Sequence, residues 1–443
     1  MRAAGVSPSA QAIFASSYAV LEAGGSGLIP EDSISPLQDL DLVDPDKESP
    51  GDRDALALTA VIRLNGGLGT SMGLDKAKTL LTVRDNLTFL DIIARQVLAA
   101  REAYGVALPL LFLHSFNTQS DCLAALSRYP GLTVAGLPLD VVQSQEPKLL
   151  RSDLSPVSWP ACPKLEWCPP GHGDLYPTLL DSGLLDQLVD AGFRYASVSN
   201  SDNLGCAPSA ALAGWFARSG APFAAEVTRR TPMDVKGGHL ARRKSDGRLI
   251  LRETAQTAPE ELAYFTDAAI HPFTHCNNLW FDLPALQAKL AATGGVLKLP
   301  LIRNAKTVDP ADPASPAVYQ IESAMGAAIE VFEGAAAIAV PRSRFRPVKT
   351  TNELALLRSD VFTLGPDYIL RAGVEPLPVV ELGKPYARIA DFDARLPQPL
   401  SLRRAASLKV AGDWRFGRDV AAVGAVRLGE AGGEVPDGTV LEG

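Results

Sequence analysis

Four glycines and two lysines lie close together in the segment LNGGLGTSMGLDKAKTLL, residues 64–81. Glycines that follow a strand allow positive φ and let backbone N–H groups converge on an anion. Lys76 and Lys78 add positive charge just beyond the glycines. This combination indicates a loop that binds a polyphosphate, because bare backbone can approach the phosphates and the ammonium groups can neutralise them.

The same segment admits other interpretations. No window of it supplies the GxxxxGK[ST] pattern of a Walker A loop, and its glycines are spaced one residue too wide for GxGxxG. GTSMG does fit GxSxG, the nucleophile elbow of α/β hydrolases, with Ser71 as the nucleophile. Asp202 with His239 or His271 could complete such a site, so the hydrolase alternative stays open. A structural turn without a ligand is also open, but it does not explain the lysines.

A second cluster of chemical interest is WCPPGHGD, residues 167–174. Its two prolines hold the chain extended, and Gly171 and Gly173 permit close approach of a ligand to the backbone. His172 stands between these glycines and can donate a hydrogen bond. We therefore predict that His172 contacts the bound ligand.

Two further clusters carry carboxylate and amide groups. In VSNSDNLG, residues 198–205, Asp202 follows an apolar run and is a candidate Mg²⁺ ligand, since Mg²⁺ prefers one or two carboxylates together with phosphate oxygens. A turn-forming Asx role for Asp202 is the alternative. In HCNNLW, the amides of Asn277 and Asn278 suit hydroxyl-rich ligands such as sugars.

A basic segment, VPRSRFRPVKT, lies farther along the chain at residues 340–350. It alternates arginines with small or apolar residues, and a proline stands shortly before Lys349. A solvated basic face is one interpretation. We favour a rigid segment that directs positive charge into a cleft.

The elements that must position these residues follow from the pattern of the chain. Apolar residues recur at helical spacing over 10–21, and residues 26–54 are dense in Pro, Ser and Asp, which favours a surface connection. From residue 55, short apolar runs alternate with helical stretches, which predicts a mostly parallel sheet covered on both faces. The polar clusters follow such runs, so they should meet at one edge of the sheet. The expected strands lie in ALTAVIRLNGG, LPLLFLHS, TVAGLPLDVVQS, RYASVSNSDNLG and APFAAEVTRR.

Composition limits the class of protein. A chain of 443 residues is too long for one compact core, and its 47% apolar and 21% charged residues are typical of globular proteins. No apolar run could span a bilayer and the N-terminal segment lacks a signal-peptide pattern, so we expect a soluble, cytoplasmic protein. Five scattered cysteines are expected to be reduced packing residues. The net charge of −8 argues against a nonspecific nucleic-acid binder.

The motifs LNGGLGTSMG, KAK, QSQEPK, WCPPGHGD, SNSDNLG, NNLW and PRSRFRPVKTT follow one another between residues 55 and 360. In sequence and order they closely resemble the UTP–glucose-1-phosphate uridylyltransferases, also called UDP-glucose pyrophosphorylases. The resemblance implies an α/β nucleotidyltransferase fold, with a Rossmann-like mixed sheet, helices on both faces and a C-terminal left-handed β-helix. Short Val and Leu steps after residue 364 are consistent with stacked β-coils, although a meander of short strands fits the pattern equally well.

The resemblance also implies domains and roles. The domains would be an N-terminal helical or irregular lead (1–54), a catalytic domain (55–364) and a β-helix-like domain (365–443). Asp202 would bind Mg²⁺, and Gln143 with the Gly171 backbone would read the uracil. The implied catalytic residues, which face the phosphates, are Lys78, Lys349 and His172. The implied nucleotide-binding residues are Leu64, Asn65, Gly66, Gly67, Gly69, Thr70, Gln143 and Gly171. The implied sugar-binding residues are Asn200, Glu253, Asn277 and Asn278.

The expected reaction is attack of a sugar 1-phosphate oxygen on the α-phosphorus of UTP, with pyrophosphate leaving. This chemistry needs positioning and charge neutralisation rather than an activated nucleophile. Two motifs differ from the family: QSQEPK stands where many relatives have NQSRYPR, and HCNN where they have NTNN. The second lies beside the sugar site, so the alternative is an enzyme that also accepts galactose 1-phosphate or other hexose 1-phosphates. A catalytically silent UDP-sugar-binding regulator is a further alternative.

The expected partners are therefore small molecules, UTP and a hexose 1-phosphate. No nucleic acid and no membrane is expected. The C-terminal domain could support self-association, since a solenoid leaves an exposed edge.

Overall fold

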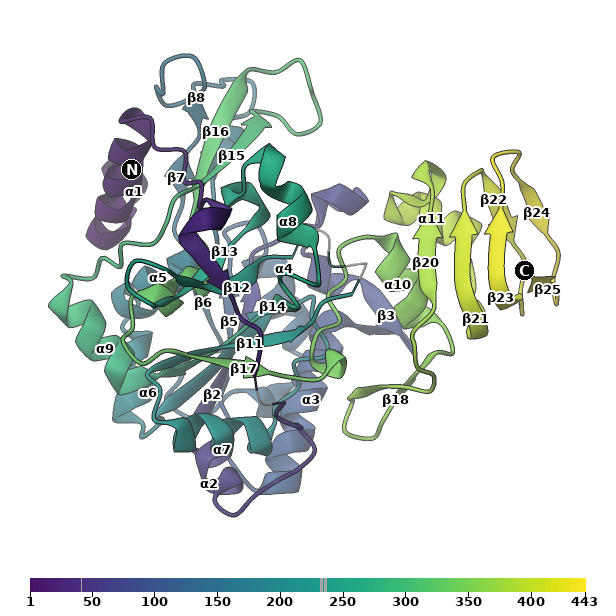
Figure 1. Ribbon diagram of the computed structural model, residues 1–443, viewed down its shortest axis with the longest axis horizontal. Coiled ribbons are helices and arrows are strands. Elements are labelled where there is room, and N and C mark those ends of the chain that lie inside the picture. The colour runs from purple at the N-terminus through teal and green to yellow at the C-terminus, as the bar shows by residue number, and fades with distance from the viewer. Residues whose placement is uncertain (41, 232–233, 235–236) are drawn as a thin grey trace.

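A seven-stranded mixed sheet forms the centre of the protein (Figure 1). The computed structural model describes residues 1–40, 42–231, 234 and 237–443, with the exception of the Ser71 side chain. The strand order is β17-β11-β14-β10-β2-β5-β6; β14 is antiparallel to its two neighbours, and the other adjacent pairs are parallel. The strands are β2 (Thr59–Asn65), β5 (Leu110–His114), β6 (Asp140–Val142), β10 (Tyr195–Asn200), β11 (Phe223–Arg229), β14 (Phe273–Asp282) and β17 (Ala336–Ala339).

The sheet has a hydrophobic core on each face. Along β2, Val61 belongs to one core, whereas Ala60 and Ile62 belong to the other, because successive side chains of a strand point to opposite faces. Burial on both sides explains why the run TAVIRLN has consecutive apolar residues at positions 60–62 and is buried almost throughout. The five expected strand runs all form strands of this sheet, as predicted.

Helices cover both faces, as the pattern predicted. The longest, α3, begins with a capping box in which Thr88 and Asp91 satisfy each other's backbone N–H groups, and it ends at Gly105 in the left-handed conformation. One core receives side chains from α2 (Asp52–Ala57), α3 (Phe89–Tyr104), α4 (Gln119–Leu126), α7 (Ala210–Ser219) and α10 (Thr351–Arg358). The other receives side chains from α5 (Leu175–Asp181), α6 (Leu184–Asp190) and α9 (Leu283–Ala292).

The N-terminal lead is more integrated than its composition indicated. Helix α1 (Pro8–Glu22) forms where helical spacing was predicted, and Ser7 caps its first turn. The segment expected to be a surface connection instead contributes strand β1 (Ile34–Pro36), which pairs with β12 (His239–Arg243). Buried Ile34 makes this pairing favourable, and no periodicity in a three-residue strand could have revealed it. The third strand of this small sheet is β13 (Leu249–Arg252).

Short elements surround the carboxyl edge of the central sheet and frame the candidate site. One three-stranded antiparallel sheet combines β15, β16 and β8, and two strand pairs accompany it. These elements are β15 (Ile302–Thr307), β16 (Ala317–Glu322), β8 (Leu149–Leu150), the pair β7 (Glu146–Pro147) with β9 (Trp167–Cys168), the pair β3 (Thr82–Arg84) with β4 (Leu87–Thr88), and helix α8 (Leu262–Thr266).

After an antiparallel pair, β18 with β19, the C-terminal region consists of parallel strands. In one sheet Ser401 pairs with Ala421 and Ala421 pairs with Val440, so successive strands stack in parallel. Neighbouring strands of a meander are antiparallel, so this sheet is not a meander. A second, separate sheet pairs β22 with β24, also in parallel. The elements are β18 (Phe362–Leu364), β19 (Leu370–Ala372), β20 (Val379–Leu382), α11 (Ile389–Arg395), β21 (Ser401–Val410), β22 (Trp414–Phe416), β23 (Ala421–Leu428), β24 (Gly433–Val435) and β25 (Val440–Glu442).

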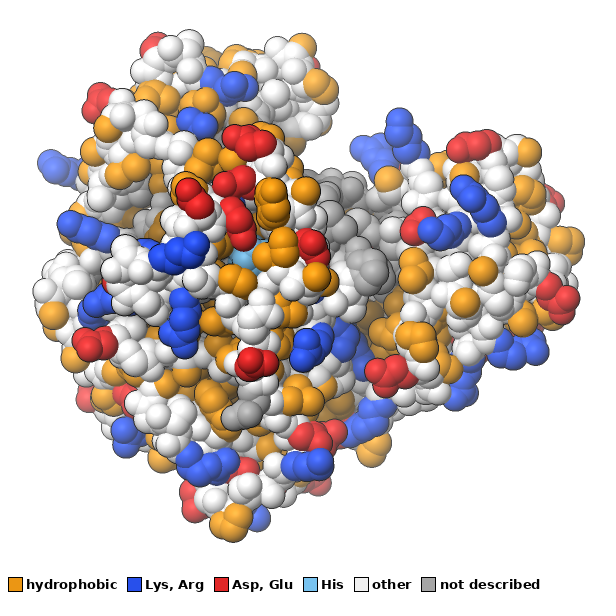
Figure 2. Space-filling model, viewed as in Figure 1, with side chains coloured by type: hydrophobic (Ala, Val, Ile, Leu, Met, Phe, Trp, Pro, Cys, Tyr) orange, Lys and Arg blue, Asp and Glu red, His pale blue; other side chains and the backbone are white. Residues whose placement is uncertain are grey.

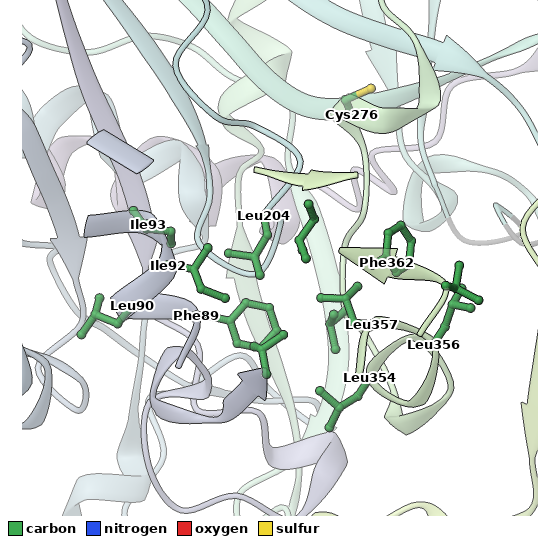
Figure 3. Close-up of a cluster of buried hydrophobic side chains, with 14 of the residues drawn as sticks. Phe89, Leu90, Ile92, Ile93, Leu204, Cys276, Leu354, Leu356, Leu357 and Phe362 are labelled. Atoms are coloured by element: carbon green, nitrogen blue, oxygen red, sulfur yellow. The ribbon is translucent and has the colours of Figure 1, made fainter. Parts of the chain in front are cut away.

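A buried cluster connects elements that are distant in sequence (Figure 3). Phe89 and Ile92 of α3, Leu204 after β10, and Leu354 and its neighbours in α10 all belong to it. Fully burying such side chains contributes roughly 1.5–3 kcal/mol each. The cluster therefore fixes the residues just before α10 relative to the loop that follows β10.

The surface mixes charges of both signs. Figure 2 shows Lys and Arg interspersed with Asp and Glu over the visible face, in keeping with the net charge of −8. Among the described residues, no helix combines the length and the apolar character that crossing a membrane requires.

Candidate active site

A cavity of about 300 Å³ opens at the carboxyl ends of β2 and β10. The edge of the sheet at which the sequence predicted the polar clusters to meet is therefore hollow. Two residues not expected from the sequence, Gln320 and Glu322 of β16, close the cavity on one side. The predicted residues that line it are Leu64, Asn65, Gly66, Gly67, Lys78, Gln143, Gly171, His172, Asn200 and Asp202.

The glycine-rich loop forms one wall of this cavity. Gly69 has φ +64°, a left-handed conformation that favours glycine. The N–H of Lys78 donates to Gly67 O at 3.2 Å, which folds the loop back on itself. The Asn65 side chain turns inward, where its amide donates to Cys122 Sγ and accepts from the Thr79 hydroxyl. The Asn65 side chain thus supports the loop, and another part of the residue lines the cavity.

Gln143 lies against the loop from the opposite side. A Cβ on Gly66 would come within 2.9 Å of Gln143 Nε2, so the glycine leaves room for this carboxamide. The Gln143 N–H donates to His114 O, which fixes the segment to β5. The next residue, Ser144, donates its N–H and its hydroxyl to the carboxylate of Asp174, both at 2.6 Å. Asp174 therefore joins the Gln143 segment to the turn that carries His172.

His172 faces the cavity in a fixed tautomer. Its Nδ1 accepts the N–H of Met325 at 2.9 Å, so in the neutral ring the proton resides on Nε2. Gly171 stands before it with φ +80°, and a Cβ there would lie 2.7 Å from Ser323 O. Burial, reinforced by the charge of Lys349, lowers the pKa of His172 to about 4. His172 can therefore donate a hydrogen bond at neutral pH without carrying charge.

We predict that His172 and His275 do not titrate between pH 5 and 8. Burial lowers the pKa of His275 to about 3, and the neighbouring His172 lowers it further. Because both pKa values fall below the unfolded value of about 6.5, these groups contribute stability that is fully present above pH 6.5 and is lost as the pH falls toward 4. Ring-proton NMR, assigned with His172→Gln and His275→Gln, measures this directly. Midpoints near 6.5 in the folded protein, like those in denaturant, would contradict it.

Asp202 lies between two lysines. Its Oδ2 accepts from Lys78 Nζ at 2.8 Å and from Lys349 Nζ at 3.2 Å. Burial alone would raise the pKa of Asp202, but the two ammonium groups overcome this and lower it to about 2. Lys78 is held more rigidly, since Nζ also donates to Val348 O and its side chain is 14% exposed against 60% for Lys349. The three residues form a compact charged group at the rim of the cavity.

The second carboxylate oxygen of Asp202, Oδ1, is suited to binding a metal ion. Oδ1 is buried and has no hydrogen-bond partner among the described residues. A buried carboxylate oxygen without a hydrogen-bond partner destabilises the folded protein unless another group, such as a cation, binds it. Within the described part of the chain no group of three or more His, Cys, Asp or Glu residues could hold a metal ion. The arrangement therefore suits Mg²⁺, which binds through one carboxylate plus substrate phosphates.

The predicted sugar side is partly assembled. The Asn277 amide donates to Asn200 Oδ1 at 3.1 Å, and Asn277 Oδ1 is buried without a partner among the described residues. Burial raises the pKa of Glu253 to about 7, opposed by the charge of Lys349. A Cβ on Gly238 would lie 2.7 Å from Glu253 Oε2, so this glycine gives the carboxylate its space.

The prediction for Asn278 needs a correction. Its amide donates to Glu226 Oε2 at 2.9 Å and its carbonyl accepts from Asn203 Nδ2 at 3.1 Å, which leaves the residue 1% exposed. The register of β14 with β11 shifts between His275 and Leu279, where Asn277 has φ +55°, and the two asparagines have different partners: Asn277 contacts Asn200, whereas Asn278 contacts Glu226.

The basic segment also behaves differently from the prediction. Arg344 is buried against Glu226, and Arg342 pairs with Asp234. Arg346 directs its guanidinium to Leu370 O and over the Phe362 ring. These arginines hold the segment in place, because each finds a partner in a neighbouring loop or strand. Lys349 brings its charge to the cavity through Asp202.

The hydrolase alternative finds no support in the partners of its candidate residues. The side chain of Ser71 lies outside the described residues. Asp202 binds two lysines, whereas His271 Nε2 pairs with Glu31 Oε1 at 2.8 Å and His239 stacks on His271 with ring centroids 3.8 Å apart. An Asp–His pair able to activate a serine is not assembled from these residues.

Sequence reasoning missed several residues that shape the site. Glu226 and Asn203 act from behind the cavity, and Gln320 and Glu322 come from a strand with no distinguishing motif. Local signals existed for Asp174, which belongs to the GHGD cluster, and for Asn203, which belongs to VSNSDNLG.

Known proteins of one family match almost the entire chain. The family model described as UTP--glucose-1-phosphate uridylyltransferase matches residues 14–422. A UTP--glucose-1-phosphate uridylyltransferase of Hordeum vulgare is 38% identical over 423 residues, covering 94% of this chain and 85% of that protein. One of Saccharomyces cerevisiae is 36% identical over 403 residues, covering 89% and 79%.

Solved structures agree with this assignment. A mutant UDP-glucose pyrophosphorylase from Leishmania major, in complex with UDP-glucose, has a TM-score of 0.93 at 39% identity and covers 100% of this chain and 96% of that one. A UDP-glucose phosphorylase from Trypanosoma brucei has a TM-score of 0.91 at 39% identity and covers 100% and 98%. The chain belongs to the UTP–glucose-1-phosphate uridylyltransferase family.

Proposed function

We propose that this protein transfers a uridylyl group from UTP to glucose 1-phosphate. A phosphate oxygen of the sugar phosphate attacks the α-phosphorus of UTP, the bond from that phosphorus to the bridging oxygen breaks, and pyrophosphate leaves. UDP-glucose is the other product. The observation that carries the proposal is the group formed by Asp202, Lys78 and Lys349 at the rim of a cavity walled by glycine-rich backbone.

Each wall of the cavity has a task in this reaction. The backbone from Gly66 to Thr70 binds the phosphates of UTP, while the Gln143 carboxamide and the Gly171 backbone bind the uracil. His172 donates from Nε2 to a phosphate oxygen, since Met325 occupies Nδ1. On the sugar side, Asn200, Asn277 and Glu253 bind hexose hydroxyls.

Charge neutralisation is the main requirement, because two polyanions must come within bonding distance. Two unit charges about 4 Å apart repel by about 4 kcal/mol at an effective dielectric of about 20. Lys78 and Lys349 offset this repulsion as the phosphates replace Asp202 as their partners. Asp202 would hold Mg²⁺ through its unpartnered Oδ1, and the ion would supply positive charge that stabilises the leaving pyrophosphate. No covalent enzyme intermediate is needed.

The decisive assay is pyrophosphate release from UTP and Mg²⁺ with a panel of sugar 1-phosphates. We expect the highest kcat/KM with glucose 1-phosphate and lower values with the galactose and mannose compounds. The relatives' names favour glucose over relaxed sugar selectivity. Binding of UDP-glucose without pyrophosphate release would instead support the silent regulator, and ester hydrolysis without UTP would support the hydrolase.

Nucleotide selectivity tests the role of Gln143. Gln143→Ala is expected to lower the preference for UTP over CTP, measured as a ratio of kcat/KM values, by about tenfold, because one hydrogen bond to the base contributes about 1.4 kcal/mol. Gln145→Ala is the matched control, since Gln145 does not line this cavity. An unchanged ratio in Gln143→Ala would show that other groups read the base.

The C-terminal region supports two further proposals. Its in-register parallel rungs, Ser401 to Ala421 to Val440, support coils of a left-handed β-helix, whose hand a crystal structure would test. Its last strand, β25, has exposed Val440 and could mediate self-association. A light-scattering mass equal to that of the monomer would contradict self-association.

The division into residues 1–54, 55–364 and 365–443 stays a prediction for limited proteolysis. The five free cysteines are in keeping with a cytoplasmic location.

A further inference from the structure

We propose that Glu226 and Arg344, buried behind the cavity, are positioning residues that hold Lys349 and Asp202 at the separation needed for turnover. The inference rests on the proposed function. It concerns an ion pair that does not line the cavity.

The pair is buried and fully engaged. Glu226 is 0% exposed and Arg344 is 3% exposed. Arg344 Nη2 donates to Glu226 Oε1 at 2.8 Å and Nε donates to Oε2 at 3.3 Å. Trp280 Nε1 and Asn278 Nδ2 complete the carboxylate at 3.0 and 2.9 Å. A buried charge pair with this many hydrogen bonds has one strongly preferred geometry.

The pair is connected to the loop that carries Asp202. Arg344 Nη1 donates to Ala207 O at 2.5 Å, and Asn203 Nδ2 donates to Arg344 O at 3.0 Å. At Gly205 the two segments approach so closely that a Cβ would lie 2.4 Å from Ser343 O. The backbone of the loop after β10 therefore packs directly on the backbone around Arg344.

The pair is equally connected to Lys349. Between Arg344 and Lys349 the chain continues along the same loop: Arg346 N–H donates to Asn203 Oδ1 at 2.8 Å, and Val348 N–H donates to Asp202 O at 3.2 Å. Helix α10 then begins at its cap Thr350. Lys349 thus lies between Arg344, which the ion pair holds in place, and the start of α10, and its ammonium contacts Asp202. A shift of Arg344 would therefore change the distance between the Lys349 ammonium and the Asp202 carboxylate.

A purely structural role is the competing explanation, because breaking any buried ion pair destabilises a protein. The two explanations differ in what changes in the folded variant. Loss of positioning lowers kcat of folded enzyme, since misplacement by about 1 Å can cost about a hundredfold in rate. A structural role lowers the melting temperature while kcat of the folded fraction stays unchanged.

The test compares Glu226→Gln and Arg344→Lys with Asp52→Asn in the full-length protein. Asp52 is the matched control, because it is a buried carboxylate (1% exposed) paired with Arg218 on α7, near the amino end of β2. Well below the melting temperature, we expect kcat to fall at least tenfold in the first two variants, with KM for UTP within threefold of wild type. In Asp52→Asn, kcat should stay within twofold. If Glu226→Gln does not fold, Arg344→Lys decides, because its ammonium keeps the charge but cannot make both bonds to the carboxylate.

A second measurement is independent of activity. Trace acetylation followed by mass spectrometry should show Lys349 reacting at least threefold faster in Arg344→Lys than in wild type, with Lys47, whose side chain is 83% exposed, as the internal reference. Unchanged kcat and unchanged Lys349 reactivity would overturn the inference. Absence of pyrophosphate release from the wild type would instead overturn the proposed function, and the acetylation result would still decide on positioning.

Discussion

Replacing Lys78 with Ala is expected to lower kcat about a thousandfold. The ammonium faces Asp202 and Val348 O, and its side chain is 14% exposed, so its charge acts in a medium of low effective dielectric. An interaction of about 4 kcal/mol with a phosphate charge about 4 Å away corresponds to about three powers of ten in rate. Steady-state pyrophosphate release with saturating UTP and glucose 1-phosphate measures the effect.

Lys349→Ala should also lower kcat, but by a smaller factor than Lys78→Ala. Its side chain is 60% exposed, and solvent screens its charge, so we expect about a hundredfold decrease in kcat. Lys76→Ala is the matched control: Lys76 and Lys78 follow the same glycine loop in the sequence, but Lys76 is exposed, and its replacement should change kcat by less than about twofold. Near wild-type turnover in both Lys78→Ala and Lys349→Ala would remove the proposed roles of these lysines.

Asp202→Asn is expected to lower kcat at least about a hundredfold and to abolish the effect of Mg²⁺ on UTP binding. The pKa of Asp202 is lowered to about 2, so the carboxylate is charged at any assay pH. An amide keeps the shape but offers no charge to a cation at Oδ1. Calorimetric titration of UTP, with and without Mg²⁺, should show tighter binding with the ion in wild type only.

Asp140→Asn provides the comparison for this experiment. The Asp140 side chain is 14% exposed against 12% for Asp202, and it lies on the neighbouring part of the sheet, where it pairs with His114 and Gln119. Mg²⁺ should still tighten UTP binding in this variant. A Mg²⁺ effect that persists in folded Asp202→Asn would show that the ion is held elsewhere.

Much of the fold was predictable because it depends on local properties of the chain. Strand β2 has a consecutive apolar run at positions 60–62, since both of its faces are buried, and a glycine-rich loop follows at once. The positive φ of Gly69 is a local requirement that few other residues meet. The order of such motifs was enough to identify the family and to place the cavity at one edge of the sheet.

The partner of each charge was not predictable from the chain. Arg342, Arg344, Arg346 and Lys349 look alike in one short segment, yet only Lys349 reaches Asp202, whereas Arg344 is buried with Glu226. The same limit applies to the neighbours Asn277 and Asn278: the first contacts Asn200 and the second contacts the buried Glu226.

The amino-acid sequence by itself determined five strands of the central sheet, the glycine loops and the set of charged residues at the carboxyl edge of the sheet. The tertiary structure alone decided which of these charges meet. Asp202 binds lysines that are 124 and 147 residues away in the chain, and Glu226 binds an arginine 118 residues away. Ion pairing depends on separation and burial in space, and these are fixed only when the helices and loops pack around the common core.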